Sequence, residues 1–217
     1  DLININSVIV KSVVEEAVKY SPNCILVVVT NPLDNMVKLA YEISGFPKNR
    51  VIGMAGVLDT ARFKTFVAME TGASVRDIEA MVLGGHGDSM VPVLNSCTVK
   101  NVPIAKMLSK EKLDAIILRT QNGGGEIVNL LKTGSAFFAP ALSVVEIVEA
   151  ILGDTKKVLP CSVLLSGEYG ETGVFVGVPV MLGRNGAEKI IEIPLRDEEK
   201  NAFKKSVEHI RVTTEKI

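Results

Sequence analysis

The sequence contains no tryptophan, and only two histidines and three cysteines occur among its 217 residues. The cysteines, Cys24, Cys97 and Cys161, lie far apart and are odd in number. This excludes a fully paired disulfide framework and fits a reducing compartment, where cysteine serves as a small apolar residue. The histidines and cysteines also lack the spacing of metal ligands, so we expect no metal site.

The sequence also lacks an excess of either charge and any long hydrophobic run. Its 24 basic and 25 acidic residues leave a formal charge of −1, so no overall field favours nucleic acid and no basic cluster suggests a membrane surface. The strongest apolar run, residues 25–29, is far too short to span a bilayer, and no signal segment opens the chain. We therefore expect a cytoplasmic protein whose partner is a small molecule or another protein chain.

Two glycine motifs of enzymes are missing as well. No Gly-x-Ser-x-Gly segment supports a serine hydrolase, and no Gly-x-Gly-x-x-Gly loop follows a predicted strand to hold a dinucleotide. The run Gly123-Gly124-Gly125 follows a predicted helix, and we interpret it as a helix break. The chain starts at Asp1 without an initiator methionine, so we expect the natural protein to begin upstream.

The first third of the sequence does show the alternation that is typical of a doubly wound α/β sheet. With 47% hydrophobic residues the chain can bury a substantial core. Apolar residues between 10 and 18 follow helical spacing, and the apolar run at 24–29 predicts a parallel strand covered on both faces. Three further elements are predicted: a helix from Leu33 that ends at Gly45, a strand at 50–54 and a helix at 58–71.

The rest of the sequence predicts a domain of helices and antiparallel strands. The pair Asn185-Gly186 is a strong signal for a hairpin turn. The predicted strands are 78–83, an extended segment at 90–99, then 162–166, 174–182 and 190–195. The predicted helices are 109–133, a buried helix at 140–152, and a terminal helix from 197 that docks through Phe203, Val207 and Ile210.

The two histidines have different settings. His209 lies one position off the apolar stripe of the terminal helix, so solvent exposure is the simplest interpretation. His86 follows a predicted strand and lies among Gly84, Gly85 and Gly87, which allow close approach of the backbone. A lone histidine in a glycine turn is more often structural than catalytic, so His86 needs a partner before it is given a role.

Asp59 and Arg62 lie three residues apart on the predicted helix. They could supply the partner that His86 needs, or they could form a surface ion pair of little consequence. Arginine offers a planar charged fork for a carboxylate, histidine exchanges a proton near neutral pH, and a carboxylate can fix the histidine tautomer. Asn31 adds an amide at the carboxyl end of a buried strand, where open α/β sheets bind ligands. It could also cap the helix that follows Pro32.

Three segments occur in the order and at the spacing of one known family: TNPLD at 30–34, LDTAR at 58–62 and GGHGDS at 84–89. The sequence resembles the lactate/malate dehydrogenase family over its whole length, including GSAFFAP at 134–140 and VGVP at 176–179. It is most similar to the lactate-dehydrogenase-like malate dehydrogenases, which tend to show GGHGD followed by MVP, as at 84–88 and 90–92 here. Lactate enzymes usually have glutamate where this chain has Gly85.

The resemblance implies a role for each candidate residue. His86 would donate and accept the proton, Asp59 would orient it, and Arg62 would bind the substrate carboxylate. Asn31 would hydrogen-bond the substrate near the nicotinamide. Two further parts of the pocket are implied, Val29 and the region around Ser135 and Ala136.

The resemblance also implies a domain organisation and a reaction. Residues 1–55 would be the C-terminal remnant of a dinucleotide-binding (Rossmann) domain, and residues 56–217 an α+β catalytic and oligomerisation domain with antiparallel strands. The family's glycine loop, its ribose-binding acid and its mobile loop would precede Asp1. The expected activity is NAD-dependent oxidation of malate to oxaloacetate, a step of the tricarboxylic acid cycle, by a homodimer or homotetramer.

Two alternatives stay open at this point. Lactate or another 2-hydroxy acid could be the substrate, because the residue that would select it lies on the loop expected upstream. The chain could also be a non-catalytic fragment that acts only in assembly with other subunits.

Overall fold

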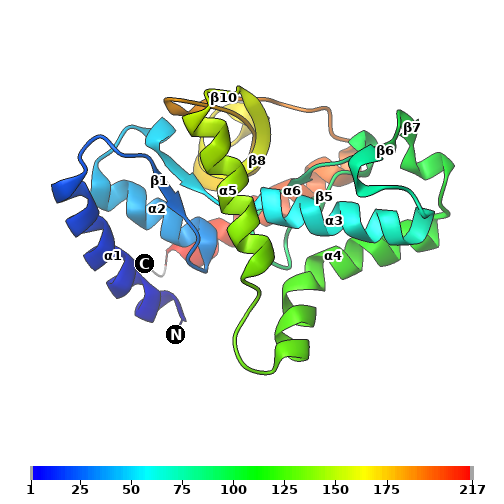
Figure 1. The fold of residues 1–217 in the computed structure, drawn as a ribbon, viewed down its shortest axis with the longest axis horizontal. Helices are drawn as coiled ribbons and strands as arrows, with labels where there is room; N and C mark the ends of the chain where they lie inside the picture. The colour runs from blue at the N-terminus through cyan, green and yellow to red at the C-terminus, as the bar shows by residue number, and fades with distance from the viewer. Residues whose placement is uncertain (1, 216–217) are drawn as a thin grey trace.

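The computed structural model describes residues 2–215. Its centre is a five-stranded sheet with the order β1-β2-β8-β9-β10. β1 and β2 are parallel, whereas the remaining neighbours are antiparallel. The strands are β1 (Leu26–Val28), β2 (Val51–Gly53), β8 (Lys157–Ser166), β9 (Thr172–Gly183) and β10 (Gly186–Ile190). The predicted fold class, a parallel α/β part followed by antiparallel strands, is thus confirmed, and both parts contribute to one sheet (Figure 1).

The N-terminal elements alternate as the sequence predicts. α1 (Leu2–Tyr20) and α2 (Leu33–Ser44) flank β1, and Gly45 ends α2 in a left-handed conformation with φ of 62°. β1 is shorter than predicted and only half-buried, because it forms an edge of the sheet. The core beneath these elements contains Val10, Val14, Leu33, Met36, Val37, Ala40 and Phe175.

β2 joins the parallel part of the sheet to the antiparallel part at one residue pair, Gly53 opposite Ser162. A Cβ atom on Gly53 would lie 2.6 Å from Val37 Cγ2 and 2.8 Å from Ser162 Cβ. No side chain fits at this position, so the strands meet there only because residue 53 is glycine.

The strand predicted at 78–83 is two strands in the structure, and this prediction is therefore corrected. β3 (Ile78–Glu79) pairs with β6 (Thr98–Val99), which in turn pairs with β7 (Val102–Pro103). β4 (Val82–Leu83) pairs instead with β5 (Val91–Pro92). At the start of β4 the Val82 N–H donates to the Thr60 hydroxyl at 3.0 Å. Five short 3₁₀ turns complete the connections: Lys48–Arg50, Val75–Asp77, Leu94–Ser96, Ile104–Lys106 and Glu168–Gly170.

α3 (Gly56–Thr71) and α4 (Lys110–Leu131) lie side by side (Figure 1). α4 continues through Gly123–Gly125, so the predicted helix break is wrong. Arg119 Nη2 and Nε donate to the Glu126 carboxylate at 2.8 and 3.1 Å, and these two exposed residues bracket the glycines.

α5 (Phe138–Leu152) is buried on one side only, which corrects the prediction of a buried helix. Its apolar residues extend around the helix, so packing on the core uses one face and leaves others exposed. Ser143, Ile147, Ala150 and Ile151 are buried, whereas the exposed fraction of Phe138 is 77%. The exposed apolar side also includes Leu142, Val145 and Leu152.

The last part of the chain contains the predicted hairpin and terminal helix. Asn185 lies in the turn between β9 and β10, and Gly186 has φ of 91°. β10 ends at Ile190, so the strand predicted at 190–195 is wrong. Side-chain bonds replace the strand there, since the Tyr169 hydroxyl accepts the Ile193 N–H at 3.0 Å.

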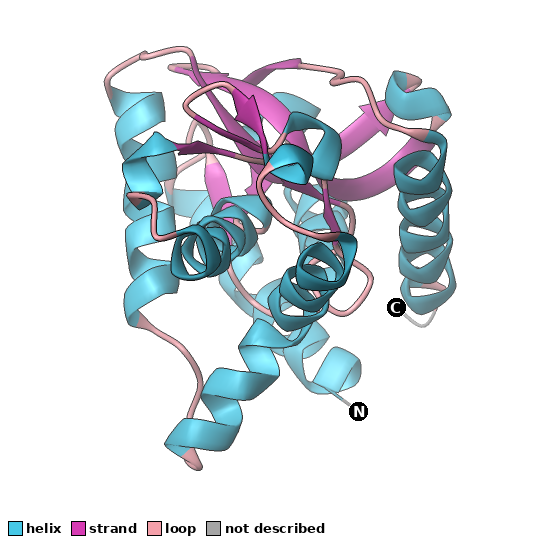
Figure 2. Ribbon diagram, turned by 90° about the vertical axis from the view of Figure 1, so that its right-hand side faces the viewer, coloured by secondary structure: helices cyan, strands magenta, loops and turns pink. Residues whose placement is uncertain are grey.

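α6 (Asp197–Thr214) packs on the sheet through Phe203, Val207 and Ile210, as predicted, and Figure 2 shows it as a long helix beside the sheet. None of the helices within residues 2–215 combines the length and the apolar character needed to cross a bilayer.

Candidate active site

The loop after β4 carries His86 and is fixed on both sides by hydrogen bonds. Gly84 exchanges two backbone hydrogen bonds with Gly177 of β9, at 2.9 and 3.0 Å. The Gly85 N–H donates to the Ser206 hydroxyl of α6 at 2.8 Å. Gly84 has φ of 87°, and a Cβ there would lie 2.8 Å from Ser206 Oγ. Glycine therefore lets the loop approach both β9 and α6 closely.

The structure brings the predicted histidine and carboxylate together. His86 Nδ1 lies 2.8 Å from Asp59 Oδ2 of α3. The Asp59 side chain is 2% exposed and that of His86 is 14% exposed. With Nδ1–H donating to the carboxylate, Nε2 is the atom that can take up or release a proton.

The surroundings of His86 favour its charged form. Burial lowers the pKa of His86, but the charge of Asp59 and its hydrogen bond raise it further, so the pKa of His86 lies above its ordinary value. Asp34 adds to the increase and Arg62 opposes it. A carboxylate held against imidazole thus stabilises the imidazolium that a proton-accepting histidine becomes.

Arg62 belongs to the same cluster. Its Nη1 atom lies 3.5 Å from Asp59 Oδ1, and its side chain is 14% exposed. The alternative of an exposed surface pair is therefore wrong. Within residues 2–215, the buried Nε of Arg62 has no hydrogen-bond partner. Arg62 lines a hollow together with Gly123 and Ala139.

Asp34 also belongs to this site, although no role was predicted for it. One carboxylate oxygen accepts the His86 backbone N–H at 2.9 Å, and the other accepts the Ser162 hydroxyl at 2.7 Å. Asp34 is buried, and burial raises its pKa although both hydrogen bonds oppose the change. Acidic residues are common in the first turn of a helix, so nothing in the sequence distinguished this one.

A cavity of about 450 Å³ lies in front of His86. Pro32, Leu33 and Asp34 line one side, and His209 and Thr213 of α6 line another. His209 is exposed, as predicted, yet it faces the same cavity as His86. The sequence could not indicate this, because the two histidines come together only through the packing of α6.

Val29 and Asn31 lie at the carboxyl end of β1, next to the cavity lined by Pro32. The exposed fraction of Val29 is 42%, and Asn31 is exposed too. The interpretation of Asn31 as a helix cap is wrong, because Pro32 occupies the cap position and no side chain caps the helix.

Ser135 and Ala136 lie in the segment between α4 and α5, where Ser135 is exposed. Among the hydrogen bonds of the described residues, none joins Ser135 to His86, Asp59 or Arg62. Its place in the pocket therefore stays a prediction. In residues 2–215 no group of three or more His, Cys, Asp or Glu side chains is arranged to hold a metal ion.

Comparison with known proteins gives a consistent result. Residues 1–53 match the NAD binding domain of lactate/malate dehydrogenase, and residues 56–217 match its alpha/beta C-terminal domain. Part of the nucleotide-binding domain is therefore present in this chain. Malate dehydrogenases from Roseiflexus sp. and Geobacillus kaustophilus are each 56% identical over 97% of this chain, which spans 68% of their length.

Solved structures agree with the sequence matches. A malate dehydrogenase from Cryptosporidium parvum superposes with a TM-score of 0.97 at 45% identity, covering 99% of this chain and 70% of that one. A lactate dehydrogenase from the same organism, solved with lactic acid and β-nicotinamide adenine dinucleotide, superposes with a TM-score of 0.95 at 41% identity, covering 97% and 68%. Fold and site define an NAD-dependent dehydrogenase. The chain belongs to the lactate/malate dehydrogenase family.

Proposed function

We propose that this protein interconverts malate and oxaloacetate with NAD. The observation that carries the proposal is the buried pair of His86 and Asp59 at 2.8 Å, with Arg62 on the same carboxylate. A 2-hydroxy acid needs a proton acceptor for its hydroxyl and a cationic clamp for its carboxylate. These three side chains supply both within one cluster.

Each residue has a defined task in the oxidation of malate. Arg62 binds the carboxylate next to the hydroxyl-bearing carbon and so orients the substrate. His86 Nε2 removes the hydroxyl proton, and Asp59 stabilises the resulting imidazolium. NAD, when bound, supplies the acceptor for the hydride that leaves the same carbon. In the reverse direction His86 returns the proton to the carbonyl oxygen.

Val29 and Asn31 would hold the nicotinamide end of NAD, and Asn31 would also hydrogen-bond the substrate. Their exposure at the end of β1 supports this assignment. Ser135 would close the substrate pocket from the segment before α5. We also propose residues 1–55 as the nucleotide-binding part and residues 56–217 as the catalytic part.

Two observations favour malate over lactate. The curated relatives at 54–56% identity to this chain are named malate dehydrogenase. A Cβ on Gly85 would lie 3.1 Å from Ser89 Oγ and 3.2 Å from Ile210. The loop therefore leaves little room for the glutamate that lactate enzymes usually have there.

The decisive experiment compares two substrates. Reduction of oxaloacetate and of pyruvate by the full-length protein is followed through oxidation of NADH. We expect oxaloacetate to give the higher kcat/KM; a preference for pyruvate would make lactate the substrate. Titration of the 217-residue chain with NADH tests the remaining alternative, since an assembly-only fragment would bind no cofactor.

We further propose a homodimer or homotetramer in the cytoplasm. The exposed apolar side of α5, with Phe138, Leu142 and Leu152, supports association of subunits. Analytical ultracentrifugation tests the assembly, because a monomer at micromolar concentration would contradict it.

A further inference from the structure

The glycine run of α4 has a cost that calls for a physical reason. Glycine inside a helix is about 1 kcal/mol less favourable than alanine, and Gly123, Gly124 and Gly125 follow one another in a continuous helix. The ion pair of Arg119 with Glu126 spans them, but it is exposed and contributes little to stability. It does not explain why the residues are glycine.

The three glycines face different surroundings. A Cβ on Gly123 would lie 3.3 Å from Arg62 Cδ and 3.8 Å from Arg62 Nε. A Cβ on Gly124 would lie 3.8 Å from Arg62 Nη1, and one on Gly125 would meet nothing within 4 Å. Gly123 is buried, so its backbone forms a wall against the stem of Arg62.

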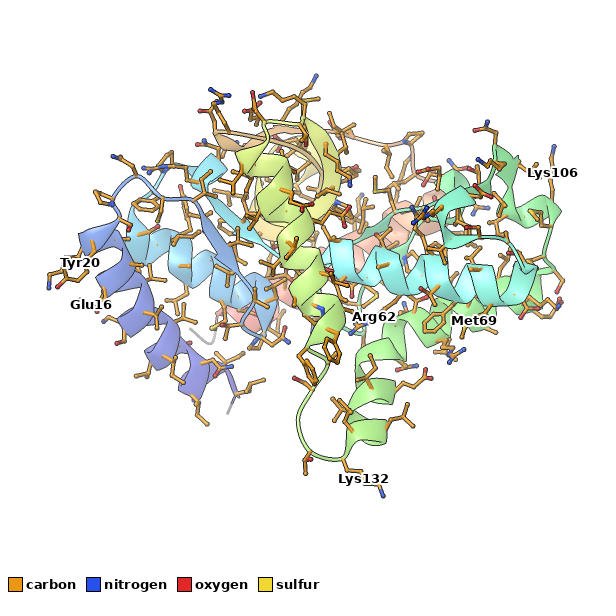
Figure 3. The ribbon with its side chains drawn as sticks, viewed as in Figure 1. Glu16, Tyr20, Arg62, Met69, Lys106 and Lys132 are labelled. Atoms are coloured by element: carbon orange, nitrogen blue, oxygen red, sulfur yellow. The ribbon has the colours of Figure 1, made fainter. Side chains whose placement is uncertain are left out.

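Hydrogen bonds alone do not fix the position of Arg62. Its contact with Asp59 is long, at 3.5 Å, and the buried Nε lacks a partner within the described part of the chain. Packing must therefore determine where the guanidinium lies. In Figure 3 Arg62 extends from α3 toward the place where α4 and α5 approach it.

We propose that Gly123 is a positioning residue for the carboxylate-binding arginine: the missing side chain at 123 sets where Arg62 presents its guanidinium to the substrate. This inference rests on the proposed function, in which Arg62 binds the carboxylate. A methyl group at 123 displaces Arg62 by a few tenths of an ångström, because its Cβ comes closer to Cδ than ordinary van der Waals contact. A bidentate pair with a carboxylate tolerates such a shift poorly.

Gly123→Ala tests this with Gly125→Ala as the matched control. Both variants gain helix propensity, so both should keep or raise the midpoint of urea unfolding. We expect Gly123→Ala alone to raise the KM for oxaloacetate about five- to tenfold, the effect of weakening a charged hydrogen bond. An unchanged KM in Gly123→Ala overturns the proposal. So does a raised KM in Gly123→Ala if its unfolding midpoint also falls, or if Gly125→Ala shows the same rise in KM.

A double variant tests whether the effect passes through Arg62. If it does, Gly123→Ala should change KM by less than twofold in an Arg62→Lys background, since the fork is already lost. If the double variant instead showed the product of the two single-variant changes in KM, the inference would be contradicted.

A measurement that needs no turnover keeps this proposal separate from the proposed function. Malate alone should raise the thermal midpoint of the unsubstituted protein and of Gly125→Ala more than that of Gly123→Ala. Equal shifts in all three proteins overturn the positioning role. Absence of malate oxidation by the unsubstituted protein, by contrast, counts against the function and leaves this comparison of binding intact.

Discussion

His86 Nδ1 lies 2.8 Å from Asp59 Oδ2, although the two residues are 27 positions apart in the chain. The loop after β4 supplies the histidine and α3 supplies the carboxylate, so the pair exists only in the folded protein. His86 also lines the cavity of about 450 Å³.

Replacing His86 should abolish most of the activity. We expect His86→Ala to lower kcat for malate oxidation by about 10²- to 10⁴-fold, the usual contribution of a general acid–base group. Steady-state kinetics on the full-length protein measure the change, and circular dichroism confirms that the variant is folded. Turnover within a factor of two of the unsubstituted protein would remove His86 from the reaction.

Replacing Asp59 should change the pH profile of the reaction. Asp59 raises the pKa of His86, and oxaloacetate reduction needs the protonated imidazole. In Asp59→Asn the loss of kcat/KM on raising the pH should therefore begin at a lower pH than in the unsubstituted protein. A profile that keeps its position would show that another group controls the proton.

The same pair should make stability depend on pH. The folded-state pKa of His86 lies above its ordinary value, so its contribution to the free energy of unfolding is fully present below the unfolded pKa of about 6.5. That contribution is lost as the pH rises through the folded pKa. Urea unfolding at several pH values should show this loss in the unsubstituted protein and a smaller one in His86→Gln.

Replacing Arg62 with lysine should weaken substrate binding. We expect Arg62→Lys to raise the KM for malate roughly 10- to 100-fold, because lysine cannot form a bidentate pair. If the unsubstituted protein and Arg62→Lys were saturated at the same malate concentration, Arg62 would not be the residue that binds the substrate carboxylate.

Asp34→Asn should cost stability, since one oxygen of an amide cannot replace two carboxylate oxygens. Asp34 accepts from the His86 backbone and from the Ser162 hydroxyl, and a buried donor left unpaired costs about 1–3 kcal/mol. Urea unfolding measures the change. Ser162→Ala is the matched comparison, because it leaves the bond between Asp34 and His86 in place.

The sequence predicted those parts of the fold that have a local signal. Helical spacing indicated α1, α2 and α6, and Asn185-Gly186 indicated the β9–β10 hairpin. Errors arose where distant contacts decide the conformation. The Tyr169 hydroxyl, 24 positions away in the chain, replaces strand pairing at Ile193.

The main residues of the candidate site were predictable from the sequence, but the residues that surround them and hold them in place were not. Motif order pointed to His86, Asp59 and Arg62, and the structure brings these together. Asp34 went without a role because a helix-start aspartate is ordinary, and its contacts with His86 and Ser162 form only when the chain folds. The contribution of His209 to the cavity likewise depends on where α6 docks.

The junction of Gly53 with Ser162 limits how this fold can be recombined. A chimaera that takes residues 1–53 from another protein must end its donor segment in glycine, since a Cβ there would lie 2.8 Å from Ser162 Cβ. It must also bring an aspartate to accept the Ser162 hydroxyl. The contacts between the two halves also include those of Asp34 with His86 and Ser162, so a grafted nucleotide-binding half must match the catalytic half at residue 34 as well as at residue 53.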